Sequence, residues 1–381
     1  MDGNVSDIQN ADPNTELHII NDKKALENIA AIVFISLLMI VGIPGNITAL
    51  LVYLRKFKPS TYRTFVVCLA VLDLAACCIS MPFILALLRY PVLFLHDEVC
   101  KLFRLLSYIP CVSSVFILIT IAVERYRKIC APHGTQMSDR MAKHICIMDI
   151  LIACCLSSPA AVIYGKRSLE IEIDNINGSS CSVSDDMVNT KYPEYFNFAN
   201  GFVLTASIIA LSIIYSLIGK KIVCMRKTGL GTNQLQSGQS YTVSTLTTGI
   251  DNIQVEVNKR EEYLDRGKTE FIPVELDTIT KYNKRHAKTI RTTRVIFTVT
   301  AVFVCSFLPY LAFSIIAALG FEKVLLQNIS FAGTVTYKLF KHIFFISNAT
   351  NPIIYGFCDR KFMDEICRLY KNICGLFLSR K

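Results

Sequence analysis

The stretch IAAIVFISLLMIVGIPGNITALLVY, residues Ile29 to Tyr53, decides the fold class because it contains no charged residue. A helix needs about 20 mainly apolar residues to cross the hydrocarbon core of a bilayer. Inside that core the backbone must satisfy its own hydrogen bonds, so an isolated apolar segment crosses as a helix. The stretch therefore predicts a transmembrane helix.

Six further apolar stretches of similar length follow this one. They lie near Thr64 to Leu88, Leu102 to Val123, His144 to Tyr164, Phe196 to Cys224, Val295 to Leu319 and Val335 to Phe357. The 381 residues are 52% hydrophobic and only 18% charged, which is too apolar for a soluble chain that must present a charged surface. We therefore expect an all-α membrane protein, a seven-transmembrane helix bundle over residues 29–357.

Basic residues in short loops predict the orientation of the bundle. They follow the first span at Arg55, Lys56, Lys58 and Arg63, and the third at Arg125, Arg127, Lys128, Arg140 and Lys143. Because Lys and Arg are enriched in cytosolic loops, we expect a multi-pass plasma-membrane protein with residues 1–28 as an extracellular tail. We expect no removable signal peptide before the first span. The sequons at Asn4, Asn177 and Asn328 then fall outside the cell as candidate glycosylation sites.

Only two of the 15 cysteines are clearly placed outside the cell by this topology. Cys100 opens the third span and Cys181 lies in the loop after the fourth, so both compartment and topology permit a disulfide. The alternative is two unpaired thiols in an oxidising compartment. Around Cys181, apolar residues alternate with polar ones from Ser168 to Asp174, which predicts a β-hairpin that turns at Asn177-Gly178 rather than a disordered acidic loop.

Two segments lie apart from the seven spans. Residues 226–284 are polar and lack apolar periodicity, so we expect a flexible cytosolic loop whose basic ends either anchor helices at anionic lipid or dock a partner. Residues 358–381 form a cytosolic tail that opens with a short amphipathic helix on the inner leaflet. Its cysteines, Cys367 and Cys374, are candidate palmitoylation sites, or else unmodified thiols.

Polar residues inside the spans mark a candidate ion site. Asp73 stands in the middle of the second span, with Ser114 in the third and Ser347, Asn348 and Asn351 in the seventh. A carboxylate with several neutral oxygens suits a small hard cation such as sodium. The alternative is a protonated Asp73 in a neutral hydrogen-bond network. We expect no required cofactor.

Short motifs occur on every span except the fourth: Gly45-Asn46, Leu69-Ala70-Val71-Leu72-Asp73, Cys100, Glu124-Arg125-Tyr126, Tyr215, Phe307-Leu308-Pro309 and Asn351-Pro352-Ile353-Ile354-Tyr355. With these motifs the sequence resembles the rhodopsin-like (class A) G protein-coupled receptors. The order and the spacing of the motifs match as well. The resemblance implies a ligand-driven receptor that activates a heterotrimeric G protein, with arrestin, a receptor kinase and membrane lipids as further partners. It implies no nucleic-acid partner.

The resemblance also assigns roles to residues. Glu124 would restrain Arg125 at rest, and an outward swing of the sixth helix would free Arg125 to meet the G protein. Tyr126 completes that motif, Tyr215 and Tyr355 would stabilise the open state beside Asn351 and Pro352, and Phe307 and Pro309 would form the hinge. The chain departs from the family in having no Trp, with Phe307 at the sixth-span Trp position and Ser207 at the fifth-span Pro position.

Absences narrow the ligand class. Ser107 stands where amine receptors of the family carry an aspartate, and Phe345 stands where opsins carry the retinal lysine. The hairpin resembles that of peptide receptors, so we expect a peptide ligand, with a small anionic or lipid acid as the alternative. Arg104, Ser107, Tyr108 and Lys341 are the candidate ligand-binding residues. Arg104 and Lys341 would offer cations to an anionic group, or would instead extend toward the extracellular interface.

Other functional classes fit less well. A membrane hydrolase would need clustered His and acidic residues within the spans, and no His-Glu-x-x-His motif occurs. We therefore expect no enzyme activity. A transporter would show two related halves with broken helices, and we detect no such internal repeat. A seven-span transporter stays a remote alternative.

Overall fold

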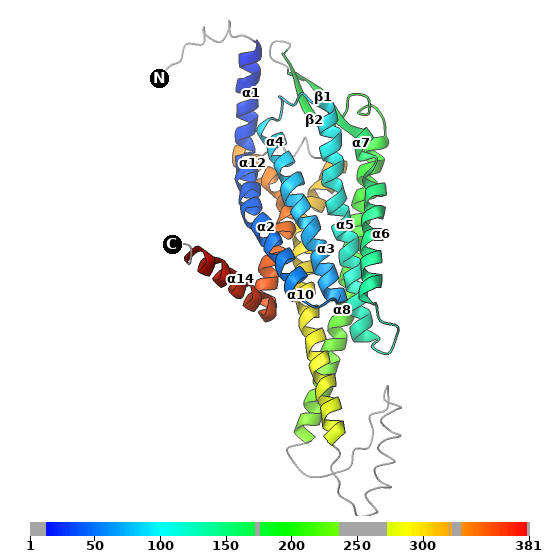
Figure 1. Cartoon of the computed structure of the whole chain (residues 1–381). Helices are drawn as coiled ribbons and strands as arrows, with labels where there is room; N and C mark the ends of the chain where they lie inside the picture. The colour runs from blue at the N-terminus through cyan, green and yellow to red at the C-terminus, as the bar shows by residue number, and fades with distance from the viewer. Residues whose placement is uncertain (1–12, 172–175, 236–272, 320, 322–328, 379–381) are drawn as a thin grey trace, which may run out of the picture.

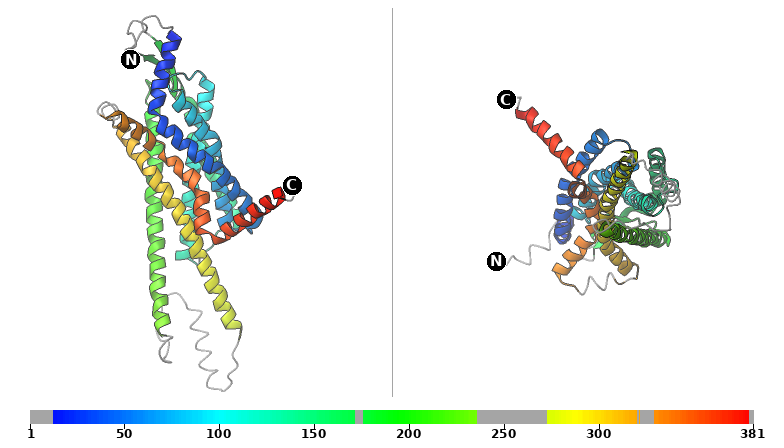
Figure 2. Two further views of the ribbon diagram at one scale, coloured as in Figure 1. Left: turned by 90° about the vertical axis from the view of Figure 1, so that its left-hand side faces the viewer. Right: turned by 90° about the horizontal axis from the view of Figure 1, so that it is seen from below.

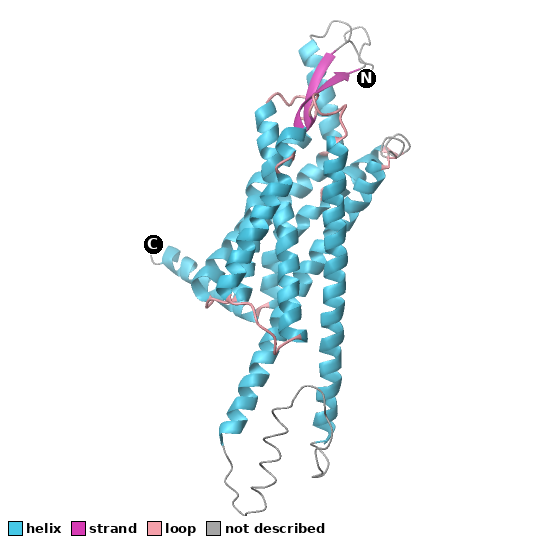
Figure 3. Ribbon diagram, turned by 90° about the vertical axis from the view of Figure 1, so that its right-hand side faces the viewer, coloured by secondary structure: helices cyan, strands magenta, loops and turns pink. Residues whose placement is uncertain are grey.

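The computed structural model describes residues 13–171, 176–235, 273–319, 321 and 329–378, which form a bundle of long helices (Figure 1). A two-stranded hairpin lies at one end of the bundle and helix α14 at the other, which we call the hairpin end and the α14 end (Figure 3). In chain order the elements are α1 Pro13–Glu27, α2 Ile29–Lys56, α3 Thr61–Ala75, a π-helical turn Ala76–Ser80, α4 Met81–Arg89, α5 Asp97–Cys130, α6 Asp139–Ser157, α7 Ala160–Ile163, β1 Tyr164–Ile171, β2 Ile176–Val183, α8 Tyr192–Leu235, α10 Pro273–Ala318, α12 Phe331–Phe340, a 3-10 turn Ile343–Phe345, α13 Ile346–Cys358 and α14 Arg360–Leu378.

Six of the predicted spans are helices long and apolar enough to cross a membrane. Within the described residues they cover Ile29–Lys56, Thr61–Arg89, Asp97–Cys130, Asp139–Ile163, Tyr192–Met225 and Thr289–Ile316. Serine caps explain where two of them begin, because Ser60 Oγ accepts from Arg63 N at 3.3 Å and Ser138 Oγ from Met141 N at 3.1 Å.

The seventh span is broken, which the apolar pattern from Val335 to Phe357 did not predict. Helix α12 ends at Phe340, His342 leaves the helical conformation (φ −113°, ψ 4°), and α13 begins at Ile346. The His342 ring takes over one of the released contacts, because its Nδ1 lies 2.8 Å from the Lys338 carbonyl oxygen. The polar face of α13 therefore starts at a tight turn rather than in a continuous helix.

The hairpin is confirmed, but the predicted position of its turn is wrong. Strands β1 and β2 pair antiparallel, with Ile171 opposite Ile176 and Glu170 opposite Asn177. Asn177 and Gly178 therefore belong to β2, and the connection falls at residues 172–175. The ladder of backbone hydrogen bonds, running from Tyr164 to Val183, outweighs the local turn preference of Asn-Gly.

Both helices that flank the polar third loop extend into the range 226–284 that we assigned to it. Helix α8 continues to Leu235 and α10 begins at Pro273, which leaves 236–272 outside the described residues. At the hairpin end, α1 adds a helix within the predicted tail. Asn28, between α1 and α2, donates to the Leu88 carbonyl at 2.9 Å, and Glu27 pairs with Lys338 of α12 at 2.5 Å. These contacts hold α1 against α4 and α12.

Helix α14 projects sideways from the bundle (Figure 2), as expected of an amphipathic helix on a membrane surface. Its first turn is anchored by Phe362, which is fully buried and stacks on Tyr53 with ring centroids 5.2 Å apart. The turn before it is fixed by Asp359, whose carboxylate accepts from Lys361 N at 3.2 Å and pairs with Arg291 of α10 at 3.3 Å.

Candidate functional site

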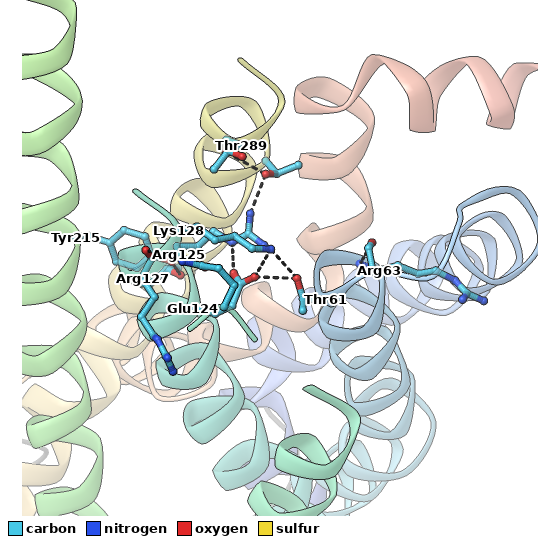
Figure 4. A network of polar contacts seen from close by, with 12 residues as sticks. Thr61, Arg63, Glu124, Arg125, Arg127, Lys128, Tyr215 and Thr289 are labelled. Atoms are coloured by element: carbon cyan, nitrogen blue, oxygen red, sulfur yellow. Dashed lines mark hydrogen bonds and ion pairs between the residues drawn. The ribbon is translucent and has the colours of Figure 1, made fainter. Parts of the chain in front are cut away.

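A buried cluster of charges lies on α5 near the α14 end (Figure 4). Arg125 Nε lies 2.6 Å from Glu124 Oε2, and each of the two side chains is at most 2% exposed. Glu124 Oε1 lies 2.5 Å from Lys128 Nζ and accepts from Thr61 Oγ1 at 2.7 Å. Because removing one partner would leave a charge buried and unpaired, the cluster holds its geometry firmly.

The Arg125 guanidinium also joins α5 to α10. Its Nη1 donates to Thr292 Oγ1 at 2.8 Å, and Thr292 in turn donates to the Thr289 carbonyl at 3.0 Å. Nearby, the Tyr215 hydroxyl of α8 lies 3.1 Å from Thr300 Oγ1 of α10. The predicted pair Glu124–Arg125 thus belongs to a larger polar network that ties α10 to the centre of the bundle. We call this network, formed by Thr61, Glu124, Arg125, Lys128 and Thr292, the lock.

Three members of this lock were not singled out from the sequence for this role: Thr61, Lys128 and Thr292. Lys128 carried a signal, because it follows Glu124 by four residues, the spacing at which helical side chains meet. Thr61 and Thr292 carried none, since each is distant along the chain from its partner. Tyr126, the third residue of the predicted motif, is half-buried and packs against the apolar core.

The predicted hinge residues lie in α10, closer to the hairpin end than this lock. Phe307 is buried, with its ring 4.4 Å from Phe303 and 5.4 Å from Phe344 of the seventh span, and Pro309 lies inside the helix. A proline in a helix removes one backbone hydrogen bond and permits bending. Aromatic contacts therefore connect the broken seventh span to the part of α10 that can bend.

The predicted ion-site residues converge around Asp73, which is buried. Its Oδ1 accepts from Asn348 Nδ2 at 2.9 Å and its Oδ2 from Asn351 Nδ2 at 2.7 Å, while Asn46 Nδ2 donates to the Asn348 carbonyl at 2.9 Å. These contacts require α2 to lie close to the π-helical turn Ala76–Ser80. Gly42 allows this approach, because a Cβ at this position would lie only 2.7 Å from Cys77 Sγ. Asn46 and Asn348 are thus buried polar groups within the bundle.

A small cavity lies beside Asp73, with room for roughly one water-sized species. It is lined by Leu69, Asp73, Ser114, Leu118, Val299, Phe303, Ser347, Asn348 and Asn351. Among the described residues, Ser114 Oγ and Asn351 Oδ1 are buried without a hydrogen-bond partner. These two oxygens and the carboxylate form a donor set that fits a small hard cation.

Two further residues of the predicted switch lie beside this network. The Tyr355 hydroxyl is buried and has no hydrogen-bond partner within the described chain, and its ring packs 5.8 Å from that of Tyr53. Pro352 lies inside α13 at a close approach to α2, since a Cβ on Gly45 would lie 3.1 Å from its Cγ. Gly45 thereby allows α2 and α13 to pack closely next to the polar core.

At the hairpin end, the Cys100–Cys181 disulfide is present and joins α5 to β2. Beside it, Arg104 Nη2 donates to the Cys181 carbonyl at 2.9 Å, and its guanidinium lies 5.0 Å from the centre of the Tyr164 ring. Arg104 is therefore held against the hairpin rather than extended toward the interface, and its role in binding an anionic group stays a prediction. The disulfide fixes the position of the Cys181 carbonyl, which accepts the hydrogen bond from Arg104.

The remaining predicted ligand-binding residues lie close to this arginine or across the bundle from it. The Tyr108 hydroxyl lies 2.9 Å from that of Tyr164, whereas Ser107 Oγ donates to its own helix at the Phe103 carbonyl. Lys341 is the residue that ends α12, with Nζ 5.5 Å from the centre of the Tyr337 ring. The helix is therefore interrupted directly after α12, next to Lys341.

The predicted modification sites are only partly covered by the structure. Asn177 is exposed on β2 and Cys367 is exposed on α14. Asn4 and Asn328 lie outside the described residues, and only the helical backbone is described at Cys374. Glycosylation and palmitoylation stay predictions.

The sequence also contains a membrane-embedded acid that we did not single out. Asp149 of α6 is half-buried and its Oδ2 accepts from Thr120 Oγ1 of α5 at 2.9 Å. An ionisable residue within a span is costly and so is informative. Its position within an apolar run of the fourth span was the signal that could have identified it.

Comparison with known proteins decides the family. The sequence pattern described as 7 transmembrane receptor (rhodopsin family) matches residues 45–355. The chain belongs to the rhodopsin family of seven-transmembrane receptors. This family consists of receptors rather than enzymes, which confirms the predicted fold and the expected absence of catalysis.

Individual members of the family with similar sequences carry neuropeptide-receptor names. Nematocin receptor 2 of Caenorhabditis elegans is 24% identical over 379 residues, covering 96% of this chain and 87% of that protein. Neuropeptide receptor npr-1 of the same organism is 23% identical, covering 87% and 70%. Neuropeptide Y receptor type 1 of Xenopus laevis is 24% identical, covering 90% and 80%.

Proposed function

We propose that this receptor binds an extracellular peptide at the hairpin end and activates a cytosolic heterotrimeric G protein at the α14 end. The orientation rests on the basic loops after α2 and α5, which lie at the α14 end, so we expect the hairpin outside the cell. The relatives named as nematocin, neuropeptide and neuropeptide Y receptors support a peptide ligand. Arg104 and Lys341 together favour a peptide that carries a carboxylate or acidic side chains.

The observation that carries the proposal is the lock on Arg125. A buried arginine that is paired with Glu124 and bonded to Thr292 holds α10 against α5 in a closed state. A ligand that binds the open state more tightly shifts the population toward it, and α10 then moves away and breaks the contact with Thr292. Arg125 is thereby exposed to the G protein. Arrestin and a receptor kinase would recognise the same open face.

The test is a screen of peptide libraries on cells expressing the full chain, with calcium and cyclic AMP measured together. We expect a peptide agonist whose response falls by about 100-fold or more in Arg125→Ala, because the group that contacts the G protein is gone, while agonist binding is retained. Arg127→Ala, a change to a half-buried arginine two positions away that bonds Thr135 rather than Glu124 or α10, is the matched control. A normal response in Arg125→Ala would overturn the coupling mechanism.

A small anionic or lipid acid is the second candidate, favoured by the same two basic side chains. The discriminating experiment screens small carboxylic acids beside the peptides and compares each active peptide with its C-terminally amidated form. Activation by an acid alone, with no active peptide, would replace the peptide by this second candidate.

We also propose that sodium binds the cavity beside Asp73, held by this carboxylate with the oxygens of Ser114 and Asn351 and of the neighbouring Ser347 and Asn348. An ion there would favour the closed state, since it joins α3, α5 and α13. Sodium should then lower agonist affinity in the wild type but not in Asp73→Asn. Equal sodium effects in both proteins would assign Asp73 to a neutral hydrogen-bond network instead.

A further inference from the structure

A second, larger hollow lies on the outer surface of the bundle, where α14 meets α2 and α13. This groove has a volume of about 370 Å³, and its lining includes Val41, Thr48, Gly356, Phe357, Met363 and Tyr370. Its size lies within the range of small-molecule sites, which is about 300–1,000 Å³. Among the described residues no charged side chain lines it, which favours an apolar occupant.

The groove exists because of residues with small or constrained side chains at its back. Gly356 leaves space in front of Met363, since a Cβ there would lie 3.6 Å from Met363 Cε. Along α2 the groove extends from Thr48 to Val41, a rise of about 10 Å that runs away from α14 into the depth of the bilayer. Phe357 and Tyr370 border it and are 84% and 51% exposed. It thus opens to lipid.

The flank of α14 beside the groove is polar and net basic. Arg360, Asp364 and Lys371 share one helical face, because they are four and seven residues apart, and all three are exposed. This face adjoins the side occupied by Met363 and Tyr370. A net basic face therefore runs along α14 beside the groove, with Lys371 directly after Tyr370 at the border of the groove.

We propose that the groove binds one acyl chain of an anionic phospholipid, whose phosphate is held by Lys371, next to Tyr370 at the border of the groove. The chain would lie along α2 and against α13, where it would brace α14 in the position seen here. A helical segment 10 Å long and about 10 Å wide occupies on the order of 800 Å³, so the groove is too small for a partner helix. The inference needs only that the α14 end lies in a membrane, and it does not depend on the ligand or on coupling.

The test uses the purified full-length receptor in vesicles that contain a phospholipid with a photoreactive diazirine on its acyl chain. One series carries a glycerol headgroup, which is anionic, and a second carries choline with the same chain. Adducts are located by mass spectrometry. We expect adducts within residues 41–48, 353–357 and 363–370 at several times the frequency of those on the lipid face of α6, with the anionic lipid preferred by about fivefold for each basic contact.

Two matched pairs of variants test the two halves of the site. Thr48→Phe fills the groove and should abolish its labelling, whereas Ile47→Phe, on an exposed position outside the groove, should not. Lys371→Gln should lower labelling by the anionic lipid about fivefold and leave labelling by the choline lipid unchanged. Lys361→Gln should change neither, because Lys361 lies over the Phe57 ring at 4.4 Å.

Three outcomes would overturn the proposal. Equal labelling of the groove and of α6 would show that the groove makes only ordinary lipid contact. Equal labelling by both lipids would show that the groove does not prefer an anionic headgroup. A rise in groove labelling in Cys367→Ser would show that the receptor's own acyl chain, attached at that thiol, fills the groove instead. Circular dichroism of each variant would establish that the bundle is intact.

Discussion

Arg125 at the α14 end and Arg104 at the hairpin end can be compared directly, because both are arginines of α5 that point into the bundle. Arg125 pairs with a carboxylate and with a hydroxyl of a neighbouring helix. Arg104 instead bonds a backbone carbonyl and lies over an aromatic ring, which leaves its positive charge without a carboxylate among the contacts described. The first arrangement keeps a helix in place, and the second can still receive an anion.

The disulfide is the contact whose loss should separate the two ends most clearly. Cys100→Ser frees β2 and with it the Cys181 carbonyl that positions Arg104, and removing a native disulfide costs about 2–5 kcal/mol. We expect loss of most surface receptor and of high-affinity agonist binding, measured by flow cytometry and ligand binding. Cys305→Ser, which removes an exposed free thiol of α10, should have no such effect.

The opposite end is tested by removing the hydroxyl that joins α10 to Arg125. Thr292→Val deletes a hydrogen bond to a charged group, worth about 1.5–3 kcal/mol, and weakens the closed state only. Basal G protein signalling should rise roughly fivefold or more, measured without agonist at matched expression. The control is Thr298→Val, whose hydroxyl bonds only the Arg294 carbonyl of its own helix. Unchanged basal signalling in Thr292→Val would mean that this contact does not restrain α10.

The cations at the hairpin end should give a smaller effect confined to the ligand. Lys341→Ala should raise the agonist concentration for half-maximal response by about tenfold, which corresponds to about 1.4 kcal/mol, with the maximal response unchanged. Lys338→Ala is matched to it, since Lys338 pairs with Glu27 instead. If both variants respond like the wild type, the ligand makes no use of Lys341.

The smallest effect should come from the exposed ion pair between α1 and α4. Asp22 accepts a hydrogen bond from Arg89 at 2.7 Å, which lowers the pKa of the Asp22 carboxyl below its usual range. A lowered pKa in the folded state contributes stability that is present at neutral pH and is lost as the pH falls through that pKa. Arg89→Gln should leave thermal stability unchanged at pH 7, because exposed pairs contribute little. Hydrogen exchange of residues 13–27 should therefore be the same in wild type and variant from pH 7 to pH 5. Faster exchange in Arg89→Gln would show that this pair, rather than Asn28 and Glu27, holds α1.

Some local features of the candidate site could be predicted and others could not. The pairing of Glu124 with Arg125 follows from a motif, and the hairpin follows from alternation of polar and apolar residues. The turn position was wrong because Asn177-Gly178 is a strong local signal, whereas the register is decided by all the paired residues together. The break at His342 was missed because apolar residues continue through it, and hydropathy does not register a change in backbone conformation.

The sequence by itself determined the membrane crossings, the hairpin, the pair of cysteines that can form a disulfide and the family. These depend on apolar length, on spacing along the chain and on short motifs, all of which are local. Only the tertiary structure decided that Thr292 restrains Arg125, that the Cys181 carbonyl receives Arg104, and that α2, α13 and α14 enclose a groove. Each of these joins residues far apart in the chain, and such contacts exist only once the helices have packed.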